Sequence, residues 1–171
     1  MTQGLYYTIV NTDAGWLGIL GSTKGLRQLT LPQCSPEEVR QLLGNNINQA
    51  SDSPHLFQDL IERLRLYFGG HSVDFPDKLD LSGTAFQRAV WMTTRLIPYS
   101  EIRSYRWVAE QIDKPKAMRA IGQALGRNPL PIIVPCHRVL ASNGNLGGFA
   151  GGLEMKRFLL NLEKAAANAR D

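Results

Sequence analysis

A cysteine, a histidine and an arginine are adjacent at Cys136-His137-Arg138, and these residue types could support nucleophilic chemistry. A cysteine attacks as its thiolate, and a neighbouring imidazole or cationic group lowers the pKa of the thiol. The apolar run at residues 132–134 predicts a buried strand or extended segment. Pro135 fixes φ, so we expect the thiol at a bend. The same residues also fit a buried structural cysteine, because free cysteine is among the most buried residue types.

Three short helices are predicted ahead of this segment. Thr84 and Gln87 form a capping-box pattern, Ser104 can cap a second helix, and a third spans about residues 116–125. Two short helices joined by a tight turn are typical of a helix-turn-helix. The third helix has small residues that would let a neighbouring helix or a nucleic-acid groove approach closely: Ala117, Ala120, Gly122 and Ala124. In the first helix we expect an inward face made of Phe86, Ala89, Val90 and Thr93.

A glycine-rich segment and another helix are predicted after the cysteine. Residues 143–152 are rich in Gly and Asn, which tolerate unusual φ values, but lack the Lys-Ser/Thr ending of a phosphate-binding P-loop. This composition fits a loop shaped around a ligand, or a plain connection between strands. The helix covers about residues 153–167 and carries Glu163. The apolar residues that we expect to pack inward from it are Leu153, Phe158, Leu159 and Leu162.

The first half of the chain predicts a small sheet followed by helices. Ser35-Pro36 begins a helix that ends near Gly44, and Ser53-Pro54 begins another that ends at Gly69. Residues 45–53 between them are polar and predict a loop. Three apolar runs separated by Gly, Asp and Asn turns predict strands over residues 5–10, 16–20 and 26–31.

The middle of the chain predicts a connection between two domains, since residues 71–82 have several Asp and Pro and little periodicity. We expect domains over residues 1–76 and 84–171, with a linker at 77–83. The charge divides in the same way. Residues 1–82 hold 6 Lys and Arg against 9 Asp and Glu, whereas residues 83–163 hold 11 against 5. A basic half on an acidic one favours a polyanion as the partner of the second half.

Cysteine content and hydropathy predict a cytoplasmic protein. No apolar run approaches the roughly 20 residues that span a bilayer, and the N-terminus lacks the pattern of a secretory signal. The two cysteines, Cys34 and Cys136, suit a reducing compartment, although a bridge between them stays open. Cys34, His55 and His71 lack zinc-ligand spacing, so we expect no metal.

Beyond these patterns, Pro135-Cys136-His137-Arg138-Val139 resembles the signature of the O6-alkylguanine-DNA alkyltransferases, also called methylated-DNA–protein-cysteine methyltransferases. The resemblance covers about residues 84–163 in the family's order and spacing, and the first half is compatible but less specific. It includes Ile97-Pro98-Tyr99, Ser104-Tyr105, Arg119-Ala120-Ile121-Gly122, Asn128-Pro129, Gly151-Gly152-Leu153 and Lys156.

The resemblance implies an α/β (α+β) fold: a small ribonuclease-H-like sheet domain, then a helical winged-helix-like domain with a helix-turn-helix. It implies DNA repair by irreversible, stoichiometric transfer of an alkyl group from O6-alkylguanine, after the damaged base has flipped out of the duplex. Cys136 resembles the acceptor, and His137 the base that acts through a water. Glu163 resembles the carboxylate that orients the histidine, and Asn128 the residue that braces the active-site turn.

The resemblance also implies how DNA is held. Arg119 resembles the side chain that takes the place of the flipped base, and Tyr105 the residue that helps the base rotate. Ala120 and Gly122 suit close approach of the recognition helix to the minor groove of double-stranded DNA. Residues that match the pocket walls are Tyr105, Leu125, Pro131, Val139, Phe149 and Ala150. We expect a monomer with no cofactor, and possible activity on O4-alkylthymine stays open.

Three positions depart from the family pattern, and one of them is Arg127, which stands one step later than the arginine of some relatives. Phe149 stands where many members have tyrosine, and Ala150 stands where some have serine, which bears on substrate breadth. Two other functions compete with alkyl transfer. One is a non-catalytic winged-helix DNA-binding protein, and the other is a cysteine hydrolase, for which the sequence shows no oxyanion hole.

Overall fold

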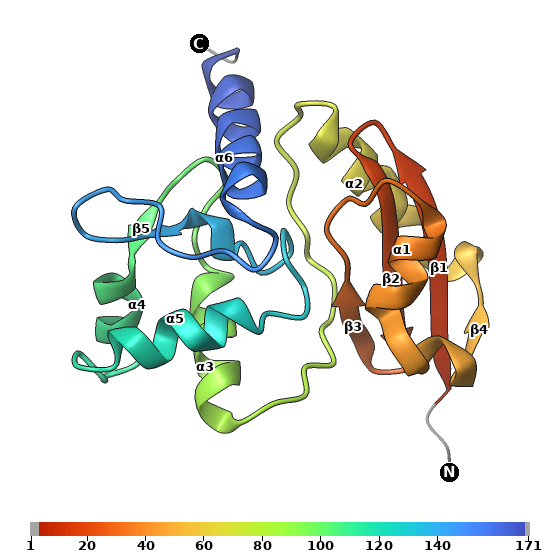
Figure 1. The fold of residues 1–171 in the computed structure, drawn as a ribbon, viewed down its shortest axis with the longest axis horizontal. Coiled ribbons are helices and arrows are strands. Elements are labelled where there is room, and N and C mark those ends of the chain that lie inside the picture. The colour runs from red at the N-terminus through yellow and green to blue at the C-terminus, as the bar shows by residue number, and fades with distance from the viewer. Residues whose placement is uncertain (1–3, 170–171) are drawn as a thin grey trace. The chain divides into compact units, whose positions relative to one another are not determined.

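The computed structural model describes residues 4–169, and the chain divides into two compact units between Ser82 and Gly83 (Figure 1). The first unit is built on a four-stranded sheet with the strand order β3-β2-β1-β4. Strands β1 to β3 are antiparallel neighbours, and β4 pairs with β1 in parallel. The strands are β1 (Leu5–Thr12), β2 (Gly15–Ser22), β3 (Gly25–Leu29) and β4 (Ala50–Asp52).

Two α-helices pack on opposite faces of this sheet (Figure 1). Ser35 caps the first as predicted, since its side chain accepts a hydrogen bond from the Glu38 N–H at 3.2 Å. Val39 and Leu43 pack on Leu20, and this helix lies so close to β2 that a Cβ on Gly18 would stand 2.5 Å from Val39 Cγ1. The helical elements are α1 (Pro36–Leu43), α2 (Gln58–Phe68) and the 3₁₀-helices η1 (Gly44–Gln49) and η2 (Pro54–Phe57).

Two segments of the first unit differ from the sequence prediction. The predicted loop 45–53 contains η1 and the short strand β4, whose parallel pairing with β1 uses backbone groups that no side-chain pattern marks. The segment expected as a linker attaches to β3. The Leu26 N–H donates to the Lys78 carbonyl at 2.8 Å, and the Asp80 N–H donates to the Leu26 carbonyl at 2.7 Å.

The second unit is mainly helical (Figure 1). Thr84 and Gln87 form the predicted capping box, and the Ser104 side chain accepts a hydrogen bond from the Trp107 N–H. The two-residue strands β5 and β6 pair in parallel, which ties the start of one helix to the segment after the cysteine. The elements are α3 (Ala85–Thr94), β5 (Arg103–Ser104), α4 (Tyr105–Gln111), α5 (Met118–Gly126), η3 (Cys136–Arg138), β6 (Val139–Leu140) and α6 (Leu153–Asn168).

The buried face of α3 is rotated from the one predicted. Ala89 is exposed, whereas Val90, Trp91 and Thr94 are buried. Trp91 turns inward because its indole Nε1–H donates to the Ala124 carbonyl of α5 at 2.8 Å. The Thr94 hydroxyl is satisfied by the Val90 carbonyl at 2.8 Å, so a polar residue can occupy a core position.

The apolar run at residues 132–134 forms a buried turn, so the prediction of a strand is wrong. Ile132 has a φ of 76°, which no strand residue adopts. The Val134 N–H donates to the Leu130 carbonyl at 2.8 Å and closes the turn. Burial made the run apolar, and an apolar run alone does not distinguish a strand from a packed turn.

The face of α6 also differs from the prediction. Leu153 and Phe158 are each 42% exposed, although both were expected to pack inward. The buried residues include Leu159, as expected, but also the charged residues Lys156 and Glu163. These two side chains point into the unit, where they have buried polar partners.

Candidate active site

Cys136 lines a cavity of about 360 Å³ in the second unit. Only 7% of the residue is exposed, so the thiol is buried yet reaches the cavity. The walls come from α4, α5 and the glycine-rich loop that precedes α6. Besides the cysteine, the lining residues are Tyr105, Arg119, Gly122, Gln123, Leu125, Gly126, Gly148, Phe149 and Ala150.

Asn128 braces the turn that presents the cysteine. Its side-chain Nδ2 donates to the Val134 carbonyl at 2.8 Å, and its Oδ1 accepts from the Leu130 N–H at 2.9 Å. The Cys136 N–H donates to the same Val134 carbonyl at 2.8 Å. Both ends of the buried turn are thereby fixed by one amide side chain, which holds the thiol at the start of η3.

His137 lies behind the cysteine and contacts a buried carboxylate. Its Nε2 is 2.7 Å from Glu163 Oε2, and neither side chain is more than 1% exposed. Among the residues that the structure describes, no hydrogen-bond partner meets the other ring nitrogen, Nδ1. A carboxylate at Nε2 favours the tautomer with hydrogen on Nε2, because the carboxylate can only accept. The Nδ1 lone pair is then available to take a proton.

Arg138 occupies the other side of the Glu163 carboxylate. Its Nε donates to Oε1 at 2.6 Å, and its guanidinium also forms an ion pair with Oε1. The remaining donors include Nη1, which bonds to the Ile97 carbonyl at 2.8 Å. The guanidinium stacks over the Tyr99 ring, 5.5 Å from its centroid. The arginine therefore joins η3, α6 and the end of α3 in one buried cluster.

Burial has the largest influence on the pKa values of Cys136 and His137. It raises the pKa of the Cys136 thiol, although a hydrogen bond from Asn128 and the charge of Lys156 oppose it. It lowers the pKa of His137, although Glu163 opposes it. Both shifts favour a neutral thiol beside a neutral imidazole. The thiol therefore keeps its proton until a base removes it, because desolvation of the thiolate outweighs its polar neighbours.

The carboxyl of Glu163 behaves differently. Burial alone would raise its pKa, but hydrogen bonds and charges from His137 and Arg138 outweigh burial and lower it. Glu163 is therefore the fixed anion of the cluster, and it can orient the imidazole without taking its proton.

Lys156 ties the glycine-rich loop to the site. Its ammonium donates to the Val139 carbonyl at 2.9 Å, to the Gly148 carbonyl at 3.3 Å and to the Leu146 carbonyl. Burial lowers the pKa of Lys156 to about 8. The loop that forms one cavity wall is thus held by a charge on the buried face of α6.

The structure brings most of the predicted site residues together. Seven line the cavity: Tyr105, Arg119, Gly122, Leu125, Cys136, Phe149 and Ala150. His137, Glu163 and Asn128 support the cysteine from behind or from the adjacent turn. Pro131 and Val139 are buried but do not line the cavity, and Ala120 lies on an exposed face of α5.

Sequence reasoning missed several residues of the site. Gln123, Gly126 and Gly148 complete the cavity wall. Arg138 and Lys156 belong to the motifs of the family, but the sequence does not predict their burial, because long cationic side chains usually lie at the surface. The adjacency of Arg138 to the reactive pair was the one signal that could have marked it.

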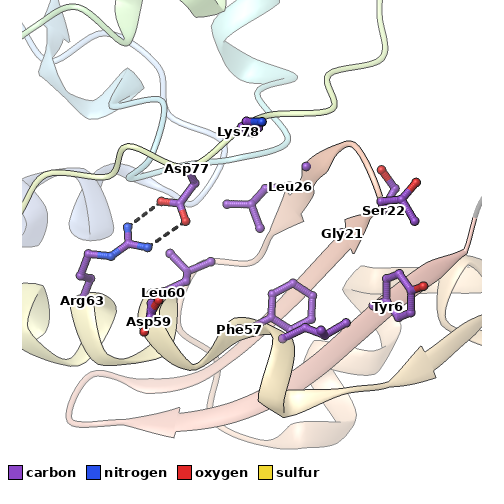
Figure 2. A pocket seen from close by; sticks show the side chains of 13 residues that line it. Tyr6, Gly21, Ser22, Leu26, Phe57, Asp59, Leu60, Arg63, Asp77 and Lys78 are labelled. Atoms are coloured by element: carbon purple, nitrogen blue, oxygen red, sulfur yellow. Dashed lines mark hydrogen bonds and ion pairs between the residues drawn. The ribbon is translucent and has the colours of Figure 1, made fainter.

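The first unit has a larger hollow of about 540 Å³, shown in Figure 2. Its centre is apolar, with Leu26, Phe57 and Leu60. Its polar lining includes an ion pair, in which the Arg63 guanidinium donates to both Asp77 carboxylate oxygens, at 2.6 and 2.9 Å. The lining residues include no cysteine or histidine, so this hollow offers no counterpart to the Cys136 cluster.

Other features of the described residues can be stated briefly. Cys34 and Cys136 are both free thiols, the first exposed and the second buried. Within residues 4–169, no helix is long and apolar enough to cross a membrane. In that same part of the chain, no three His, Cys, Asp or Glu side chains gather closely enough to hold a metal ion.

Two family models and many known proteins match the chain. The 6-O-methylguanine DNA methyltransferase, ribonuclease-like domain, matches residues 5–81, and the DNA binding domain of the same name matches residues 85–165. A methylated-DNA–protein-cysteine methyltransferase from Mycobacterium tuberculosis is 39% identical over 96% of both chains. One from Methanosarcina acetivorans is 39% identical over 93% of this chain and 98% of its own. The crystal structure of Mycobacterium tuberculosis OGT in complex with DNA has a TM-score of 0.80 at 40% identity, and covers 94% of both chains.

Proposed function

The chain belongs to the 6-O-methylguanine DNA methyltransferase family, and from that premise we propose which of its residues carry the reaction. The family resemblance and the predicted α/β fold class are confirmed. The activity that follows from membership is DNA repair by transfer of an alkyl group to a cysteine of the protein itself. The non-catalytic and hydrolase alternatives receive no comparable support.

The acceptor in this proposal is Cys136. The observation that carries it is the position of the thiol, which lines a cavity with a histidine next to it in the chain and a carboxylate bound to that histidine. Cys34, the other cysteine of the chain, is exposed and lies outside this cavity. A thiol that lines a cavity of this size can meet one bound base.

The transfer is a single displacement. The sulfur of Cys136 attacks the alkyl carbon on guanine O6, so that a carbon–sulfur bond forms as the carbon–oxygen bond breaks. His137 takes the thiol proton at Nδ1 through a water. The guanine departs as an anion and takes one proton from water at its ring nitrogen N1, while the imidazolium returns its proton to water. The protons balance, and the product is a thioether that the protein does not reverse. Neither a cofactor nor a metal is needed, because the two reacting atoms come from the protein and the DNA.

Glu163 and Asn128 act as positioning residues in this scheme. Glu163 accepts the Nε2 hydrogen of His137, which leaves Nδ1 free to act as the base. Asn128 holds the turn on which the sulfur stands. Because displacement requires the sulfur, carbon and oxygen atoms in line, small shifts of the turn would slow the reaction strongly.

DNA approaches from the open side of the cavity in this proposal. Arg119 is exposed and also lines the cavity, so it can fill the space left in the stack by the flipped guanine. Tyr105 lines the cavity from α4 and contacts the base. Ala120 and Gly122 let α5 approach the minor groove of double-stranded DNA, where the readout is nearly independent of sequence.

The remaining parts of the proposal concern the whole protein. It acts as a monomer on DNA that carries O6-alkylguanine. Its two free thiols suit the cytoplasm. The first unit supports the second and takes no part in the transfer.

Intact-protein mass spectrometry tests the function directly. The full chain is mixed with a short duplex that contains one O6-methylguanine. We expect one methyl group per chain, located by peptide mapping on Cys136, and the same gain in a Cys34→Ala control. Unchanged mass with sequence-selective DNA binding would support the non-catalytic reading. Methylation at Cys34 would refute the assignment of the acceptor.

A further inference from the structure

Arg138 is a buried cation to which the proposed transfer gives no role. Its side chain is only 8% exposed, and its partners are the Glu163 carboxylate, the Ile97 carbonyl and the Tyr99 ring. Burying a guanidinium is costly unless all of its charge is matched. An ion pair at the surface would hold α6 in place with a smaller desolvation cost. The burial of this pair therefore suggests a chemical role.

The carboxylate is divided between two neighbours. Arg138 Nε donates mainly to Glu163 Oε1, at 2.6 Å, and more weakly to Oε2, at 3.3 Å, while His137 Nε2 lies 2.7 Å from Oε2. The guanidinium is itself fixed by the Ile97 carbonyl and stacked on Tyr99, so the carboxylate cannot rotate without breaking a charged hydrogen bond. Oε2 therefore stays aimed at Nε2, and the imidazole keeps one tautomer.

The charges around His137 lead to the same conclusion. The groups that face it are Glu163 and Lys156 from α6, Arg138 from η3, and the Cys136 thiol. A buried carboxylate by itself would draw a proton onto the imidazole and form an ion pair with it. Arg138 already neutralises that carboxylate, so a second cation on the ring would be unmatched, and Lys156 adds to this repulsion.

We propose that Arg138 is a positioning residue: by holding one side of the Glu163 carboxylate it keeps His137 uncharged, with hydrogen on Nε2, and so sets the lower pH limit of alkyl transfer. The inference rests on the proposed role of His137 as the base. Without Arg138, the ring would be protonated at mildly acidic pH and could not accept the thiol proton.

The test compares the pH profiles of three proteins: wild type, Arg138→Met and Arg138→Lys. Arg138→Met removes the charge and keeps an unbranched side chain, whereas Arg138→Lys keeps the charge. We expect the acid limb of the transfer rate to move up by about one pH unit or more in Arg138→Met, a loss of about tenfold near pH 6 with near-normal transfer near pH 8.5. Arg138→Lys should restore most of the acid limb.

A second readout does not depend on transfer. In wild-type protein with ¹⁵N-labelled histidine, the His137 signals should show the neutral Nε2–H tautomer from about pH 6 to 8, with His55 and His71 as internal comparisons. This measurement remains decisive if Arg138→Met fails to fold.

Two outcomes would overturn the inference: a protonated or Nδ1–H His137 in wild type near pH 7, or an unmoved acid limb in folded Arg138→Met. Failure of the proposed function looks different, since wild type would then transfer no methyl group at any pH.

Discussion

The two units each contain an arginine–carboxylate pair with two hydrogen bonds, and the pairs differ in burial and in the other partners of the carboxylate. Arg63 and Asp77 in the first unit retain side-chain exposures of 23% and 15%, whereas Arg138 and Glu163 in the second retain 8% and 1%. The first carboxylate is bonded to its arginine at the rim of a hollow, and the second is shared with an imidazole. Water can therefore hydrate the Arg63–Asp77 pair if one partner is lost, whereas it has little access to the Arg138–Glu163 pair.

The comparison shows where this chain accepts the cost of burying charge. Among the described residues, Arg138, Lys156 and Glu163 are the charged side chains classed as buried, and all three belong to the second unit. A buried ion pair is a weak source of net stability, because desolvation offsets the attraction between its members. The cluster therefore supports the role that we propose for Cys136 and His137, for which a buried, fixed carboxylate is useful.

The largest effect should come from the sulfur itself. Cys136→Ala is expected to abolish methyl transfer to the protein while duplex DNA is still bound, because the cavity walls remain. Mass spectrometry measures the first property, and fluorescence anisotropy with a labelled duplex measures the second. Cys34→Ala, in the first unit, should change neither. Methyl transfer that persists in Cys136→Ala would show that the acceptor is not this cysteine of the second unit.

Removal of the carboxylate should lower the free energy of unfolding by different amounts in the two pairs. Glu163→Gln leaves Arg138 buried without its counter-ion, at a cost of about 3 kcal/mol or more. Asp77→Asn should cost about 1 kcal/mol or less, because its partner is partly exposed. Hydrogen exchange during urea titration reports each unit separately, and Glu154→Gln on the exposed side of α6 is the control. Equal costs would show that burial of the second pair has no special weight.

The same pair gives a pH dependence. The pKa of Glu163 is lowered in the folded protein, so its stabilisation is complete above the unfolded pKa of about 4.3 and is lost as pH falls through the lower folded pKa. In acid, hydrogen exchange in α6 should therefore accelerate, and this acceleration should be absent in Glu163→Gln. An identical acid response in both proteins would contradict it.

Alkylation should destabilise only the second unit. The added methyl group enters a site packed against Asn128 and α5, and overpacking of this kind costs about 1–3 kcal/mol. Hydrogen exchange before and after reaction with a methylated duplex should show faster exchange around η3 and α5, with the first unit unchanged. A melting temperature that does not move on methylation would argue against a tightly packed acceptor site.

A smaller effect is expected at the cavity mouth. Arg119→Ala should slow repair of duplex DNA by about tenfold, equivalent to about 1.4 kcal/mol, with reaction of the free base O6-benzylguanine largely kept. The reason is that Arg119, in the role proposed for it, acts on the DNA and does not touch the reacting atoms. Arg40→Ala in the first unit is the control. Equal losses on duplex and free base would count against the proposed role of Arg119.

Local signals made the helix starts predictable. Ser35, Thr84 and Ser104 cap their helices as expected, because a cap is decided by a few neighbouring residues. The parallel strand β4 was missed since its pairing depends on backbone far along the chain. The strand prediction for residues 132–134 was wrong because a buried turn can be as apolar as a buried strand.

The site was less predictable than the helices. The adjacency of Cys136 and His137 suggested a reactive thiol, but only the family resemblance pointed to Glu163, which lies 26 positions after His137. The inward face of α6 was misread because apolar residues were expected there, while Lys156 and Glu163 hold the buried positions. Which charges become buried depends on partners from other elements, and no periodicity reports them.

The chain order of this cluster has a consequence for synthesis. A ribosome produces Cys136 and His137 before it produces Lys156 and Glu163, which lie on α6. Until that helix has emerged, the imidazole has no carboxylate to orient it and the glycine-rich loop has no tether. If Cys136 is the acceptor that we propose, the thiol of a nascent chain is therefore not yet reactive, and it can accept an alkyl group from DNA only after α6 has docked.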